Sequence, residues 1–181
     1  VAILLKSGRD DAEESAQERI HCQWHALRML RENPLTGVGY SQILEHFRLT
    51  AHNAYLLAPA ELGYIGTYLW YGVSYTTFRL LLAVRNLTKD KPEARVAQIW
   101  SEALIASHVT LHIGIMFLSF NYHPIYWIYS GLASAVYKST QSHIPSFEIP
   151  ITKRDHIRHG TISAAVLGFW KLFIEYKYAK L

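Results

Sequence analysis

The chain has 181 residues, of which 50% are hydrophobic, a formal net charge of +4 and a single cysteine, Cys22. One cysteine excludes an internal disulfide and a cysteine-based metal site. The basic residues flank the apolar stretches instead of forming one patch, so the positive charge does not indicate nucleic-acid binding.

The N-terminal segment combines a short apolar start with a polar helix. Residues 1–5 are apolar and are interpreted as the end of a membrane helix that begins upstream, so we expect the chain to be part of a longer protein. Apolar residues then recur at every third or fourth position, which predicts an amphipathic helix over about 12–32. Asn33-Pro34 ends this helix, because the residue before a proline is disfavoured in the α region. A polar and aromatic loop is predicted from Tyr40 to Asn53.

Two long apolar runs follow. Residues 62–84 contain one charge, Arg79, and residues 103–137 contain none. About 20 apolar residues suffice for a helix to cross a bilayer, and these runs lack the polar face of a soluble core helix. Asn121-Tyr-His-Pro124 divides the second run. We therefore predict three transmembrane helices, one from Leu56 or Leu62 to Val84, the others over 99–119 and 124–137.

Charge placement predicts how these helices are oriented. Lysine and arginine cluster in residues 79–95 and again in 138–158, and such clusters mark the cytoplasmic side. The segment 1–55 is then the end of a membrane helix followed by an extracytoplasmic loop. Residues 56–138 hold the three spans with a cytoplasmic connector at 85–98. Residues 139–181 are expected to form a cytoplasmic or interfacial tail, and whether 161–181 lies on the membrane or crosses it is left open.

Three motif elements stand in order around the predicted loop. Glu18-Arg19 is followed by Trp24, and then by Asn33-Pro-Leu-Thr-Gly37-Val-Gly39-Tyr40. The third element is His52-Asn53, nine residues, and Gly63-Tyr-Ile-Gly66. Together they resemble the signature of the O-antigen ligase and polymerase family, over roughly residues 15–137.

The resemblance implies an all-α, multi-pass membrane bundle related to the C-type glycosyltransferases. Its members transfer a glycan from a polyprenyl diphosphate to a sugar hydroxyl of a glycan or lipid-linked acceptor, outside the bacterial cytoplasmic membrane and without a metal or other cofactor. The expected partners are this donor, the acceptor, membrane lipids and further membrane helices. Because the family's upstream arginine-bearing helices are absent from this chain, the chain alone is expected to be inactive.

The resemblance and the chemistry together nominate a set of site residues. Histidine can accept the proton of an attacking sugar hydroxyl near neutral pH, which makes His52 the candidate base. Arginine binds phosphate groups and keeps its charge, which makes Arg19 the candidate partner of the diphosphate. Gly63 and Gly66 are expected to form one small helix face that a neighbouring helix approaches closely. The other candidates are Arg9, Arg48, Asn53 and Glu61 for substrate binding, and Gly37 and Gly39 as structural motif residues.

Each assignment has a structural alternative. His52 or Asn53 could cap the following helix, and Glu61 could orient His52 or cap backbone groups. Arg19 could instead pair with Glu14 or Glu18. His108 and His112 have metal-ligand spacing, but a third ligand is not evident, so buried hydrogen-bonding histidines are favoured and no metal site is predicted. The alternative function is a non-catalytic membrane subunit derived from the family and packed in a larger complex.

Overall fold

A computed structural model describes the chain at residues 2–89 and 91–181, with side chains from residue 13 onward. Every regular element in those residues is helical, so the predicted all-α class is confirmed. The helices are α1 (Ala2–Glu32), α2 (Ile43–His46), α3 (Ala54–Thr88), η1 (Pro92–Ala94), α4 (Arg95–Gly114), α5 (Pro124–His143) and α6 (Lys153–Tyr178).

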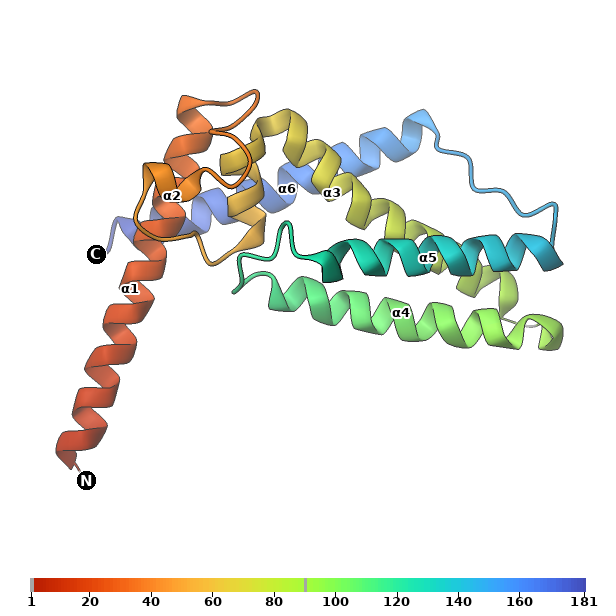
Figure 1. The fold of residues 1–181 in the computed structure, drawn as a ribbon, viewed down its shortest axis with the longest axis horizontal. Helices are drawn as coiled ribbons and strands as arrows, with labels where there is room; N and C mark the ends of the chain where they lie inside the picture. Colours follow the sequence, from red (N-terminus) through yellow and green to blue (C-terminus); the bar gives the residue numbers. More distant parts are fainter. Residues whose placement is uncertain (1, 90) are drawn as a thin grey trace.

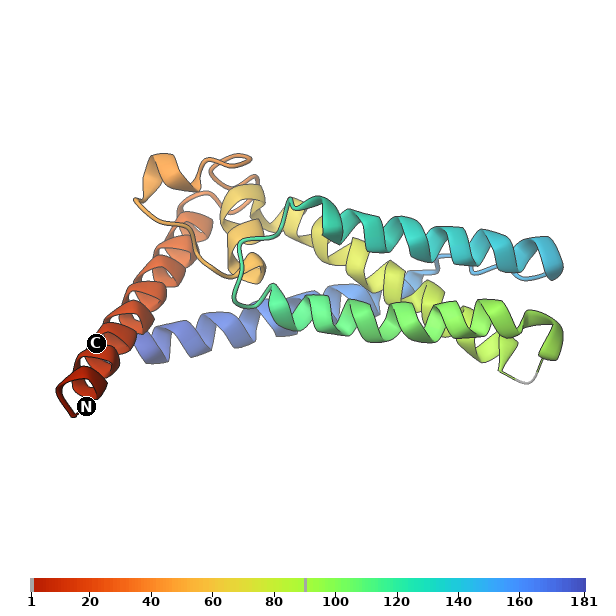
Figure 2. The ribbon, with the colours of Figure 1, turned by 60° about the horizontal axis from the view of Figure 1, so that its bottom comes forward.

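The long helix α3 is the centre of the fold, because α1, α4, α5 and α6 all pack against it. α4 and α5 lie side by side along its second half, and α6 follows it on another side (Figures 1 and 2). The C-terminal half of α1 and the loop that contains α2 gather at the end where α3 begins, while the N-terminal half of α1 projects from the bundle. One end of the bundle therefore holds most of the irregular chain.

The apolar surface of the bundle is only partly covered. The accessible surface is 11074 Å², whereas a compact 20.8 kDa protein exposes roughly 9,000 Å². Large apolar side chains are exposed along the four long helices α3 to α6, among them Leu69, Ile113, Ile128 and Leu172. Among the described residues, however, none of the helices has the length and apolarity that a bilayer crossing requires. The multi-pass arrangement stays a prediction.

Several predicted helix boundaries differ from the observed ones, including those of α4, which covers Arg95–Gly114 and not 99–119. α1 begins at Ala2 and not near residue 12, so the apolar start and the polar segment form one helix. The change from apolar to charged residues was interpreted as a boundary, but glutamate, alanine, glutamine and arginine are good helix formers, and no proline interrupts them. α5 continues to His143, beyond the predicted end at 137. The predicted end of the first helix at Asn33-Pro34 and the predicted start of a helix at Pro124 are confirmed.

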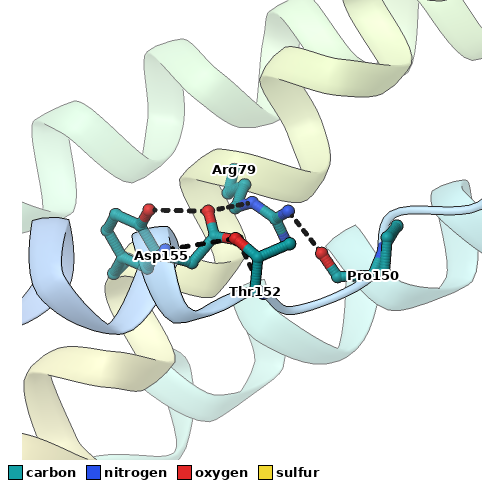
Figure 3. A network of polar contacts seen from close by, with 5 residues as sticks. Arg79, Pro150, Thr152 and Asp155 are labelled. Carbon is teal, nitrogen blue, oxygen red and sulfur yellow. Dashed lines mark hydrogen bonds and ion pairs between the residues drawn. The ribbon is translucent and has the colours of Figure 1, made fainter.

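Polar contacts around Arg79 join the start of α6 to α3 (Figure 3). Arg79 is the one charged residue in the apolar run 62–84 of α3. The Arg79 Nε lies 2.9 Å from the Asp155 Oδ1, and its Nη2 donates to the Pro150 carbonyl oxygen at 2.7 Å. Tyr75 donates its hydroxyl to the same Asp155 oxygen at 3.2 Å. Thr152 and Asp155 form a reciprocal capping box at the first turn of α6. The one charge of the apolar run 62–84 is thus neutralised by the helix that packs against it.

The other end of α6 reaches α1. Trp170 and Ile174 belong to the same buried cluster as Ala26 and Leu56. The Tyr178 ring stacks on Trp24 with 4.5 Å between centroids, and Arg31 pairs with Glu175. Residues 161–178 are therefore part of one helix that follows α3 back to the end where the loop lies.

The Asp155 network predicts a pH-dependent contribution to stability. The Thr152 hydroxyl and backbone N–H, together with Tyr75 and Arg79, lower the pKa of Asp155 from 3.8 to about 2. Because the folded-state pKa is the lower one, this stabilisation is present above pH 3.8 and is lost as the pH falls through about 2. In chemical unfolding followed by circular dichroism, wild type should be more stable than Asp155→Asn at pH 5, and the difference should shrink toward pH 2.

Glu148→Gln is the matched control, since Glu148 is an exposed carboxylate in the segment before α6. It should leave the unfolding free energy near that of wild type at both pH values. An Asp155→Asn effect that is equally large at pH 2 and pH 5 would contradict the assignment.

Candidate functional site

The segment 34–39 docks on a break in α3. Gly63 has φ 62° and ψ −168°, so the helix is interrupted there. A continuous helix would join the carbonyls of Ala60 and Glu61 to the N–H groups of Tyr64 and Ile65. Instead, the two carbonyls accept from Val38 N at 2.9 Å and Gly39 N at 3.0 Å. The two N–H groups donate to the carbonyls of Pro34 at 2.7 Å and Leu35 at 3.4 Å, so all four groups keep a partner.

Gly37 and Gly63 make this docking possible. A Cβ on Gly37 would lie 2.3 Å from the Glu61 carbonyl carbon, and one on Gly63 would lie 2.4 Å from the Leu35 carbonyl carbon. Both glycines also have positive φ, which other residues rarely adopt. The predicted Gly63-x-x-Gly66 helix face is wrong, because Gly63 is not helical and Gly66 faces the Leu62 side chain of its own turn. Gly39 also has positive φ, at 109°.

His52 and Asn53 stand at the start of α3. The Asn53 side chain accepts from Tyr55 N at 3.0 Å and caps the helix. This confirms the capping role considered for Asn53. The same role was considered for His52, but the N-cap position belongs to Asn53. His52 is half-buried, and its φ of 47° lies in the left-handed region, where histidine is tolerated better than most residues. Uncommon backbone conformations of this kind occur preferentially at functional sites.

The turn between α4 and α5, residues 115–123, closes over the same end of the bundle. The hydroxyls of Thr50 and Ser119 lie 2.6 Å apart, and Ala54 N donates to the Ile115 carbonyl at 2.9 Å. The rings of Tyr40 and Tyr122 lie 4.3 Å apart. The sequence interpretation treated this turn only as an interruption between two spans. The polar residues of this turn, which lie between two apolar helices, were the sequence signal from which its contact with the loop could have been predicted.

Glu61 is a buried carboxylate that connects three segments. It is 1% exposed, and its two oxygens accept from Ile43 N at 3.2 Å and Asn121 Nδ2 at 3.4 Å. Of the two roles considered, capping of backbone groups is therefore shown, at the first turn of α2. Burial, and then the Glu61 carboxylate, raise the pKa of Tyr122 well above its usual value. The Tyr122 hydroxyl stays protonated, and among the described residues it has no hydrogen-bond partner.

The candidate arginines lie on the α1 side of this end. Arg19 is exposed on α1, and Arg48 pairs with Glu18, so Glu18 is bound by the loop arginine and not by Arg19. The Glu18–Arg48 pair holds the loop against α1. Arg9 lies outside the residues whose side chains are described. The joint role of Arg19 and His52 at one substrate stays a prediction.

Three polar rings, those of Tyr55, His112 and His108, form a partly buried chain that runs inward from the loop. This chain was not predicted from the sequence. The Tyr55 hydroxyl lies 2.5 Å from His112 Nδ1, and His112 Nε2 lies 3.2 Å from His108 Nε2. This confirms the interpretation of His108 and His112 as hydrogen-bonding histidines. Within the described chain, no three histidine, cysteine or acidic residues are grouped so that they could hold a metal ion.

Hydrogen bonds connect two of the three motif elements at this end of the bundle. Arg19, the candidate partner of the diphosphate, lies exposed on α1. Hydrogen bonds join segment 34–39 and the 115–123 turn to the first part of α3, and the turn reaches Ala54, two residues after His52. Such contacts can fix the position of a histidine at the end of the bundle. Comparison with family models, with curated proteins and with solved structures finds no match to this chain.

Because of the close contact at Gly63, we expect a single added methyl group to lower the free energy of unfolding substantially. Gly63→Ala must place its Cβ against the Leu35 backbone and hold a positive φ, so we expect a loss of about 2–4 kcal/mol in unfolding free energy. Gly131→Ala is the matched control, because Gly131 is exposed in α5 and its added Cβ would meet nothing within 4 Å.

Chemical unfolding followed by circular dichroism measures both variants. The control should be unchanged or gain up to about 1 kcal/mol from helix propensity. Equal stability of the two variants would show that segment 34–39 does not dock on α3 in this way.

Proposed function

We propose that this chain is the C-terminal part of a membrane glycosyltransferase of the O-antigen ligase and polymerase type. The enzyme transfers a glycan from a polyprenyl diphosphate to a sugar hydroxyl, and His52 accepts the proton of that hydroxyl. The resemblance of the three motif elements to this family is the origin of the proposal.

The observation that carries it is the convergence of two of these elements in space. Segment 34–39 and the break at Gly63 exchange four backbone hydrogen bonds, although they lie more than twenty positions apart in sequence. The first element, Glu18-Arg19 with Trp24, also reaches this end, because Trp24 packs against the cluster that contains Ile43, Ala51 and Leu56. Motif residues that form one contact unit next to a histidine are what a shared catalytic role requires.

The chemistry assigns a separate task to each group. His52 takes the proton as the hydroxyl oxygen attacks the anomeric carbon, and the bond to the diphosphate breaks with its electron pair. The leaving diphosphate needs a cation, for which Arg19 is the first candidate, with Arg9 and Arg48 in reserve. Asn53 and Glu61 act through position, since Asn53 caps α3 and Glu61 holds the loop beside the histidine.

The proposed setting is the bacterial cytoplasmic membrane, with α3, α4 and α5 crossing it and the loop on the outer side. The exposed apolar residues along these helices support contact with lipid. In this orientation α6 cannot stay on the cytoplasmic side, because Tyr178 and Glu175 contact α1 at the loop end. We therefore propose that α6 returns to the outer side and is not the cytoplasmic or interfacial tail that the sequence suggested.

Cysteine labelling in intact cells tests this topology. In a Cys22→Ala background, a membrane-impermeant maleimide should label Lys180→Cys from outside and should label Lys89→Cys only after the cells are permeabilised. Labelling of Lys89→Cys in intact cells would refute the orientation. Labelling of Lys180→Cys only after permeabilisation would refute the return of α6.

Substitution of His52 tests the catalytic assignment. In membranes that contain the complete protein, His52→Gln should reduce transfer of polyprenyl-linked glycan by about 10²- to 10⁴-fold, because glutamine keeps hydrogen-bonding capacity but cannot accept the proton. His46→Gln is the matched control, since His46 is an exposed histidine of the same loop. The amount of each variant in the membrane is measured alongside.

The same experiment distinguishes the glycosyltransferase from the alternative, a non-catalytic membrane subunit of a larger complex. Near-normal transfer by His52→Gln would remove His52 as the base. A complex that assembles normally with His52→Gln and shows no transfer activity in wild type would favour the non-catalytic membrane subunit.

A further inference from the structure

A groove runs between α3, α4 and α6, and its lining extends from Tyr55 near the start of α3 to Asn86 near its end. Its volume is about 890 Å³, within the usual range of roughly 300–1,000 Å³ for pockets that hold small molecules. Phe78, Ile162 and Val166 are among the apolar residues that line it. An apolar molecule of elongated shape is therefore the kind of ligand that the walls admit.

Two polar groups that line this groove lack hydrogen-bond partners. His159 and Ser163 lie one turn apart on α6 and are 5% and 8% exposed. The His159 Nε2 and the Ser163 Oγ are buried and have no partner among the described residues. A buried donor without a partner costs about 1–3 kcal/mol, so a ligand group that accepts from these two side chains would remove that cost.

One end of the groove carries a net positive charge. Arg79 and Asp155 line this end and neutralise each other. Arg158 also lines it, and in the described chain it takes part in no ion pair. Lys153 and Arg154 are exposed on the first turn of α6, one turn before Arg158. The unbalanced charge is complementary to an anionic group.

We propose that this groove binds an anionic phospholipid. The phosphate head lies at Arg158, the ester carbonyls accept from His159 and Ser163, and one acyl chain follows Ile162, Val166 and Phe78. Arg158, Ser163 and Val166 follow one another along α6, so the charged group and the apolar wall lie at different positions along the groove. Basic pockets between membrane helices hold lipid head groups in this way. The inference is independent of glycan transfer and of His52.

Native mass spectrometry of the purified full chain in detergent tests the proposal. Dioleoylphosphatidylglycerol should bind saturably with one high-affinity site, and dioleoylphosphatidylcholine should bind at least about tenfold more weakly, as expected for the loss of a charge-assisted contact. Arg158→Gln should remove that difference without changing the helix content. Inorganic phosphate at millimolar concentration should not displace the lipid, because it offers nothing to the apolar walls.

Replacing each of two alanines by phenylalanine provides a matched comparison. Ala83→Phe fills this groove, and Ala135→Phe fills the separate apolar groove between α4 and α5. We expect the high-affinity site to be lost in Ala83→Phe and kept in Ala135→Phe. Equal binding of the two lipids to wild type, displacement by phosphate, or unchanged binding in both Ala83→Phe and Arg158→Gln would each overturn the proposal.

Discussion

The exchange of backbone hydrogen bonds at Gly63 is the constraint on which the loop end of this fold depends. Breaking α3 there frees two carbonyls and two N–H groups, and all four are satisfied by residues 34–39. Because backbone groups cannot be left buried without partners, the break and the docked segment require each other. Both glycines are needed at the contact, since a Cβ on either would overlap backbone atoms. The same contact places Glu61 where it reaches Ile43 N.

Local sequence signals predicted the fold where the cause is local. Prolines at 34 and 124 mark observed boundaries of α1 and α5, because proline restricts its neighbour and fits the first turn of a helix. The break at Gly63 was not predicted, since a glycine within an apolar run is compatible with a helix until another segment is there to bond the freed groups. For the same reason the role of Asp155 was missed. Its partner Arg79 lies 76 positions earlier, and nothing in the sequence joins the two.

The candidate site shows the same division. His52, Asn53 and Glu61 were recognised from motif spacing, and the fold gives the last two hydrogen-bonding roles in the first part of α3. Asn121 and Tyr122 were missed, because only the folded chain brings the 115–123 turn over the loop. Arg19 was nominated by the family resemblance alone, and the fold places it exposed on α1.

The contact between α6 and α1 has a consequence for synthesis on the ribosome. Trp170 and Ile174 complete a buried cluster to which Ala26 and Leu56 contribute, and α6 emerges after α1, α3, α4 and α5. Until then, that cluster is open on one side and its apolar residues are exposed. Contacts so distant in sequence form slowly, because a long stretch of chain must be ordered first. The nascent chain therefore passes through a stage in which α1 can pack on α3 while the apolar residues that α6 later covers are still exposed.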